Sequence, residues 1–226
     1  YSGEMMGHFA QVTADKYGFS REEMDNYAIE SVTRAQRAVA DGTFAGEISP
    51  VTIKSRHGET VVDTDETPGT VSVEKIPTLR PAFAKDGTVT AATSSSISDG
   101  AAAVVMMTAA EAEKRGLTPI ARIVGHSAFA QEPAWFTTAP IYAVKKLHEA
   151  LGWTPDDVEL YEINEAFACV TMAAMKDVGI GHDKVNVNGG ACALGHPIGA
   201  TGSRISVTLL HELAARGLTR GIASQC

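Results

Sequence analysis

The stretch that decides the fold is NGGACALGHPIGATG, at residues 188–202. It holds five glycines within fourteen residues. The run Val185–Asn188 predicts a strand directly before it, and a helix is predicted after it, over about Thr201–Arg216. A glycine-rich turn between a strand and a helix is typical of α/β proteins, in which ligands bind beyond the carboxyl ends of the strands.

Strands and helices continue to alternate on the N-terminal and C-terminal sides of this turn. Such alternation predicts a mainly α/β architecture, with helices packed on a sheet. The strand at 101–107 is expected to be buried because all of its residues are apolar. Predicted strands lie at 101–107, 121–130, 158–163, 185–188 and 221–226, and predicted helices at 108–116, 140–151, 166–177 and 201–216.

The first third of the chain follows a different pattern. Ser20–Glu23 forms a capping box, which predicts a helix that ends near Asp41. Two strand-like runs, Ile48–Ile53 and Thr60–Asp63, flank a turn at Ser55–Gly58 and predict a hairpin. We therefore expect a smaller α+β unit before the alternating region.

Composition excludes several classes of protein. The 226 residues are 44% hydrophobic and carry a net charge of −8, which argues against a nucleic-acid binder because such proteins need a basic face. The longest apolar run is far shorter than the roughly 18 residues of a membrane span. We therefore expect an ordinary globular protein with no nucleic-acid or membrane partner.

The cysteines and the chain ends carry further expectations. The cysteines are Cys169, Cys192 and Cys226, an odd number without C-x-x-C spacing, so we expect no disulfide framework, no metal site and a reducing, cytoplasmic location. The sequence starts at Tyr1 rather than Met and stops just after a largely apolar stretch. We expect it to be a segment of a longer protein.

The glycine-rich turn allows more than one interpretation. Gly190 and Gly195 have the spacing of a phosphate-binding loop, but His196 and Pro197 stand where that motif has lysine and serine or threonine. An NTPase is therefore rejected, and the dinucleotide motif is absent as well. Either the turn is purely structural, or it presents His196, which Pro197 restricts to extended conformations, to a ligand.

Two more polar residues fall at the ends of predicted strands. Asn164 is either the N-cap of the following helix or an amide presented at the sheet edge. Cys226 ends the last predicted strand and is either a buried apolar residue or a reactive thiol. Because the carboxyl ends of parallel strands share one edge, we expect Asn164, His196 and Cys226 to lie around one pocket.

Several motifs carry a resemblance to the thiolases, and among them to the acetyl-CoA acetyltransferases. They are Asn164–Phe167, Gly189–Gly199, Gly87–Ala91, Ser98–Ala103 and Gly221–Cys226, and the similarity covers essentially the whole chain. The resemblance implies part of a layered α/β fold, with a mixed sheet between helices on both faces and an α+β loop domain. It implies three units: a loop domain covering coenzyme A at 1–97, the last strand and helix of the N-terminal half at 98–117, and a truncated C-terminal domain at 118–226.

The resemblance also implies a chemistry and residue roles. The activity would be the reversible Claisen condensation and thiolysis that interconverts acetyl-CoA and acetoacetyl-CoA, with coenzyme A thioesters as substrates and no separate cofactor. His196 would activate the acyl-accepting cysteine and donate to the thioester oxygen, and Asn164 would hold a water at the same oxygen. Cys226 would exchange the α-proton. Ser95 would contact the pantetheine arm, and Met6 stands where many relatives have a histidine near that arm.

The chain departs from the family pattern in ways that leave alternatives open. In the family the acyl-accepting cysteine lies in a part that precedes Tyr1, and neither Cys169 nor Cys192 stands in its motif. Differences at Met6, Thr67–Gly69 and Ala92–Thr93 leave a 3-ketoacyl-CoA thiolase of longer chain range as one alternative. A non-catalytic, lipid-binding module of the same fold is another. We expect the segment alone to be inactive and the intact protein to be a homo-oligomer, a dimer or a tetramer.

Overall fold

A computed structural model of the chain describes residues 3–226, so the first two residues of the predicted 1–97 unit lie outside that range. The helices are α1 (Met6–Tyr17), α2 (Arg21–Ala40), α3 (Glu66–Thr70), α4 (Ala109–Lys114), α5 (Ala139–Leu151), α6 (Ala168–Val178), α7 (Ala191–Leu194) and α8 (Thr201–Arg216). The strands are β1 (Val51–Ser55), β2 (Gly58–Val62), β3 (Leu160–Ile163) and β4 (Gly221–Ser224). Short 3₁₀ turns lie at Thr43–Gly46, Val73–Thr78, Pro133–Thr138, Pro155–Asp157 and His182–Lys184.

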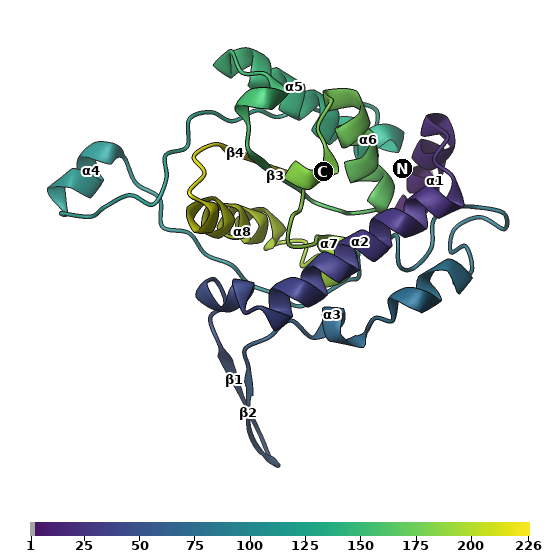
Figure 1. Cartoon of the computed structure of the whole chain (residues 1–226), viewed down its shortest axis with the longest axis horizontal. Coiled ribbons are helices and arrows are strands. Elements are labelled where there is room, and N and C mark those ends of the chain that lie inside the picture. The colour runs from purple at the N-terminus through teal and green to yellow at the C-terminus, as the bar shows by residue number, and fades with distance from the viewer. Residues whose placement is uncertain (1–2) are drawn as a thin grey trace.

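A parallel pair of strands forms the centre of the layered part. β3 and β4 pair from Leu160↔Gly221 to Ile163↔Ser224. Helices α5 and α6 cover one face of the pair and α8 covers the other (Figure 1). Alternate residues of a strand point to opposite faces, so Tyr161 packs in the cluster with α5 and α6, whereas Leu160 packs with α8. This arrangement confirms the predicted α/β architecture with helices on both faces.

Helix α2 joins the first third of the chain to this layered part. It begins with the predicted capping box, in which Ser20 Oγ accepts from Glu23 N and the Glu23 carboxylate accepts from Ser20 N. Its buried face packs against α7 and the 3₁₀ turn at Val73–Thr78. Arg34 reaches across and donates to the carbonyls of His182 and Val185. The helix is thereby tied to the chain that leads into the glycine-rich turn.

The predicted hairpin is present. β1 and β2 pair antiparallel around the turn at Ser55–Gly58, where Gly58 has φ +123°, a backbone conformation that favours glycine. The two strands are almost wholly exposed and extend from the body of the molecule (Figure 1).

The strand predicted at Val185–Asn188 is reduced to an isolated parallel bridge between Val185 and Tyr161, because the chain turns at Asn186, which has φ +47°. Two other predicted strands are wrong altogether. Residues 101–107 and 121–130 form no strand in the described structure, and their apolar side chains face solvent: Val105 is 89% exposed and Ile123 is 73% exposed. An apolar run creates a strand only where a neighbouring strand completes its hydrogen bonds, and within residues 3–226 neither run has one. Helix α4, which joins the two runs, lies away from the core (Figure 1).

Helix α1, in contrast, is present although no sequence signal predicted it. The residue before it, Met5, makes no side-chain capping bond, and Gly7 interrupts its apolar pattern. Tertiary contacts stabilise it instead: Ala10 and Ala14 are fully buried in the cluster that holds the start of α6.

Candidate active site

Asn164 directly follows β3, at the carboxyl end of the parallel pair. Its backbone N–H donates to Ser224 O at 2.9 Å, which continues the pairing with β4. Its side chain is only 1% exposed, yet neither Oδ1 nor Nδ2 has a hydrogen-bond partner. The N-cap of α6 is Phe167, three residues later, so the interpretation of Asn164 as an N-cap is wrong. Its amide remains available to a water or a ligand.

Cys226 lies two residues beyond β4, at the same end of the strand pair as Asn164. The residue as a whole is exposed, but desolvation of its thiol raises the pKa of Cys226 to about 11. Cys169, at the start of α6, is fully buried, and burial together with the nearby Cys226 raises its pKa to about 12. Both thiols are therefore protonated at neutral pH.

His196 follows the glycine-rich turn and is partly buried. Its backbone N–H donates to Ser96 O at 2.9 Å, and it forms an isolated parallel bridge with Ile97. Its ring Nδ1 lies 2.6 Å from Thr201 Oγ1. Desolvation, followed by the positive charge of Arg204, lowers the pKa of His196 below its ordinary value of 6.5. The imidazole is consequently neutral at pH 7.

The segment that contains Ser95 connects the turn after Asn164 with His196. Ser95 donates from both its N–H and its hydroxyl to Ala166 O, at 3.1 and 3.0 Å, so it lies beside the turn that follows Asn164. One residue later, Ser96 receives the bond from His196. An open hollow of about 420 Å³ lies next to this point, between Ser98–Ala102 and Pro197–Ala200.

Met6 lies at the first turn of α1 and is 60% exposed. The next residue, Gly7, packs so closely on Phe83 that a side chain there would clash with its ring. Phe83 in turn meets Phe167 edge to face, with the ring centres 6.1 Å apart. The start of α1 is thus held close to the turn between Asn164 and α6, while the side chain of Met6 is accessible to solvent.

The main chain therefore brings the predicted residues toward one region. Asn164 and Cys226 share a sheet edge, and the strand-like segment at 94–97 bonds to the turn after Asn164 on one side and to His196 on the other. That the side chains of Asn164, His196 and Cys226 surround a single pocket stays a prediction.

Glu165 is the residue that the sequence interpretation missed. It is fully buried, and its carboxylate accepts four hydrogen bonds. Oε1 accepts from Tyr27 and Asn186 at 2.8 and 2.9 Å, and Oε2 accepts from Ser31 at 2.8 Å and from the backbone N–H of Cys192 at 2.9 Å. The carboxylate thus holds α2, the turn after β3 and the glycine-rich turn together. One sequence signal could have identified Glu165: it is a charged residue directly beside Asn164, within a buried motif.

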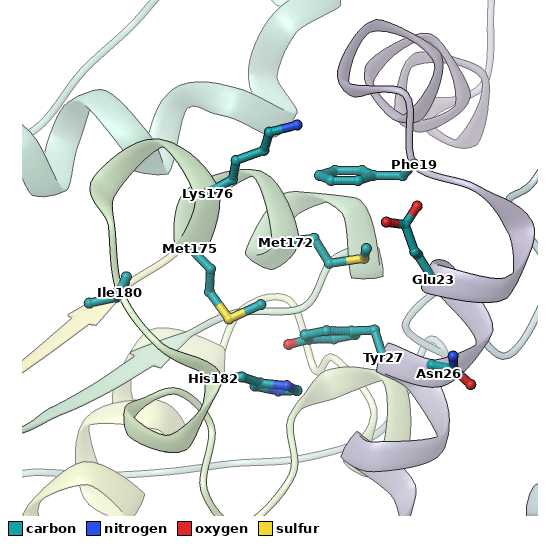
Figure 2. Close-up of a pocket in the computed structure, with 9 residues that line it drawn as sticks. All are labelled: Phe19, Glu23, Asn26, Tyr27, Met172, Met175, Lys176, Ile180 and His182. Carbon is teal, nitrogen blue, oxygen red and sulfur yellow. The ribbon is translucent and has the colours of Figure 1, made fainter.

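A larger hollow, of about 530 Å³, lies between α2 and α6 (Figure 2). None of the predicted site residues lines it. The rings of Tyr27 and His182 stack there with their centres 4.9 Å apart. The lining residues are Phe19, Glu23, Asn26, Tyr27, Met172, Met175, Lys176, Ile180 and His182.

Within residues 3–226, no group of three or more histidine, cysteine, aspartate or glutamate side chains is placed to hold a metal ion. No helix in the same range is both long and apolar enough to cross a bilayer. The fold and the site define a layered α/β protein with a candidate catalytic region at the carboxyl ends of its parallel strands.

Comparison with known families identifies this class further. The model of the thiolase N-terminal domain matches residues 1–110, and that of the thiolase C-terminal domain matches residues 117–226. The chain belongs to the thiolase family.

Relatives and solved structures agree with this assignment. The chain is 49% identical to the acetyl-CoA acetyltransferase of Paracoccus denitrificans over 98% of its length, and 46% identical to that of Rhizobium meliloti over its whole length. The Bacillus anthracis acetyl-CoA acetyltransferase superposes on 99% of the chain with a TM-score of 0.96 and 45% identity. Human mitochondrial 3-ketoacyl-CoA thiolase superposes on 98% of it with a TM-score of 0.90 and 36% identity. The chain spans 56–58% of the length of these proteins.

Proposed function

We propose that the whole protein is an acetyl-CoA acetyltransferase. It would join two acetyl-CoA molecules into acetoacetyl-CoA and free coenzyme A, and would catalyse the reverse thiolysis. The names of the relatives and of the most similar solved structure described above support this assignment.

The observation that carries the proposal is the unpaired amide of Asn164. A buried polar group without a hydrogen bond costs about 1–3 kcal/mol, and both polar atoms of this side chain are buried and unpaired. A cost of this kind is typical of sites at which the missing partner arrives with the substrate. Asn164 would hold a water that donates to the thioester oxygen, where negative charge develops as the enolate forms.

His196 and Cys226 would handle the protons. In thiolysis the acyl-accepting cysteine attacks the 3-keto carbon, the bond between C2 and C3 breaks, and the departing acetyl-CoA carbanion takes a proton. The raised pKa of Cys226 keeps its thiol protonated at neutral pH, which suits the proton donor of that step. The lowered pKa of His196 keeps its imidazole neutral, which suits a base that removes the proton of the accepting thiol.

The preferred acyl chain length is a separate point. Met6 offers an exposed apolar side chain at the start of α1, and we propose that it contacts the substrate near the pantetheine arm. An apolar side chain tolerates a longer acyl chain, which is the observation that favours the alternative 3-ketoacyl-CoA thiolase. Comparing kcat/KM for acetoacetyl-CoA and 3-ketooctanoyl-CoA, in the wild type and in Met6→His, decides between the two.

We also propose how the whole protein binds coenzyme A, where it is located and how it is assembled. Ser95 would contact the pantetheine arm, and no cofactor other than the coenzyme A thioester would be needed. The free thiols of Cys169 and Cys192 support a reducing, cytoplasmic location. The family resemblance supports a homo-oligomer and the division at residues 97 and 117.

Asn164→Ala in the whole protein tests the function. We expect kcat for acetoacetyl-CoA thiolysis to fall by about 10²–10³-fold, as for loss of a donor at an oxyanion site. Asn26→Ala is the matched control, because Asn26 is exposed on α2 and lies at the other hollow. A folded Asn164→Ala variant with wild-type turnover, or a wild type without thiolysis, would overturn the proposal.

A further inference from the structure

Thr201 is the first residue of α8 and is completely buried. Its hydroxyl has two hydrogen-bond partners. Oγ1 lies 2.6 Å from Nδ1 of His196, and it lies 3.0 Å from the carbonyl oxygen of Pro197. A single hydroxyl, with one proton to give, is therefore shared between the candidate base and a backbone carbonyl.

The chemistry of the two partners decides where that proton lies. The Pro197 carbonyl oxygen can only accept, whereas Nδ1 of a neutral histidine can either donate or accept. If the hydroxyl proton pointed to Nδ1, two oxygens 3.0 Å apart would face each other with no proton between them. If it points to Pro197 O, then Nδ1 carries its own proton and donates to Oγ1, and both bonds form.

We infer that Thr201 is a positioning residue that holds His196 in the tautomer protonated at Nδ1, so that Nε2 is the nitrogen that takes the substrate-side proton. The role in turnover rests on the proposed function. When Nε2 removes the proton of the accepting thiol, that proton stays on Nε2 until it is returned. Nδ1 keeps its own proton throughout, and none passes through Thr201.

The tautomer can be read without an activity assay. In the whole protein labelled with ¹⁵N at histidine, the imidazole shifts of His196 distinguish a protonated from an unprotonated ring nitrogen, and His196→Asn identifies the signals. We expect Nδ1 to be protonated and Nε2 to be unprotonated above the pKa of the ring. A neutral ring protonated at Nε2 overturns the inference, whether or not the protein is a thiolase.

Variants test the consequence for turnover. Thr201→Val keeps the shape of the side chain but removes the acceptor. We expect mixed tautomers and a fall in kcat of up to about tenfold with little change in KM, because only the fraction of the ring that is protonated at Nδ1 can then act as the base. Thr201→Ser should restore both the ¹⁵N pattern and kcat to within about twofold of the wild type.

A matched control separates positioning from folding. Thr208→Val removes another buried hydroxyl of α8, one that bonds to Glu47 rather than to His196. It should leave the shifts of His196 and kcat unchanged. A folded Thr201→Val variant with the wild-type tautomer and kcat would refute the inference. If that variant does not fold, the wild-type shifts and Thr201→Ser still decide. The expected tautomer in a protein without thiolysis would refute only the proposed function.

Discussion

Replacing Glu165 with glutamine should destabilise the protein although it removes no volume. The carboxylate is fully buried and accepts four hydrogen bonds, two at each oxygen. A glutamine amide has one oxygen that accepts and one NH₂ group that donates. Whichever way the amide is placed, its NH₂ group must face two donors that now bond to a carboxylate oxygen.

The size of the loss in stability depends on which of the four donors can rotate toward another acceptor. The hydroxyls of Tyr27 and Ser31 can rotate. The backbone N–H of Cys192 cannot, and the Asn186 amide is held because its Oδ1 accepts from Ile163 N at 2.8 Å. One donor therefore stays unpaired in either orientation, which costs about 1–3 kcal/mol, and the remaining bonds lose their charge. We expect a total loss of about 2–4 kcal/mol in the free energy of unfolding.

Glu162 provides a matched control two residues earlier, on β3. It is also buried, and its burial raises its pKa to about 8. It therefore carries a proton at pH 7, and glutamine imitates a protonated glutamate closely. The unfolded glutamate is ionised at pH 7 and must take up a proton to fold, whereas glutamine need not. We therefore expect Glu162→Gln to cause no loss at pH 7 and to raise the free energy of unfolding, by up to about 3 kcal/mol.

Urea denaturation at pH 7, followed by circular dichroism, measures both variants. The comparison requires that the slope of the unfolding free energy against urea concentration is the same in the variants and the wild type. A changed slope would indicate a different unfolding transition. Equal losses for Glu165→Gln and Glu162→Gln would refute the argument, and so would a Glu165→Gln variant as stable as the wild type. Either result would mean that the four donors find other partners.

Three further predictions concern activity and pH. The 226-residue chain alone should show no measurable acetoacetyl-CoA thiolysis, because Cys169 and Cys192 are buried with raised pKa values; turnover abolished by mutating either would contradict this. In the whole protein, His196→Ala should lower kcat/KM for acetoacetyl-CoA thiolysis by about 10²–10³-fold, whereas Cys192→Ala should lower it only a few-fold. A folded Cys192→Ala variant that is as inactive as His196→Ala would show that the Cys192 thiol takes part in the chemistry. The raised pKa of Glu162 favours folding at low pH, so the free energy of unfolding should fall between pH 4.5 and about 8, by up to about 1.4 kcal/mol per unit. Glu162→Gln should flatten the measured curve.

The parts of the fold that could be predicted from sequence are those specified locally. Helix α2 begins at its capping box, and α8 has the predicted bounds, because the backbone hydrogen bonds that define a helix are made within it. The strand predicted at 101–107 failed because strand formation depends on a partner, which an apolar run does not specify. The position of Asn164 could be predicted, since it needs only the end of a strand. The role of Glu165 could not, because its donors come from residues 27, 31, 186 and 192.

The glycines that first suggested a phosphate-binding loop have a different physical use. Gly189 has φ +82°, and a side chain there would come within 2.5 Å of Ser31 O on α2. A side chain at Gly190 would collide with the carboxylate of Glu165, and one at Gly195 would collide with Ser98. These glycines therefore let α2, the carboxylate and the segment before 101–107 approach the turn closely. Since His196 follows directly after Gly195, close packing of the protein on itself fixes the position of the candidate base.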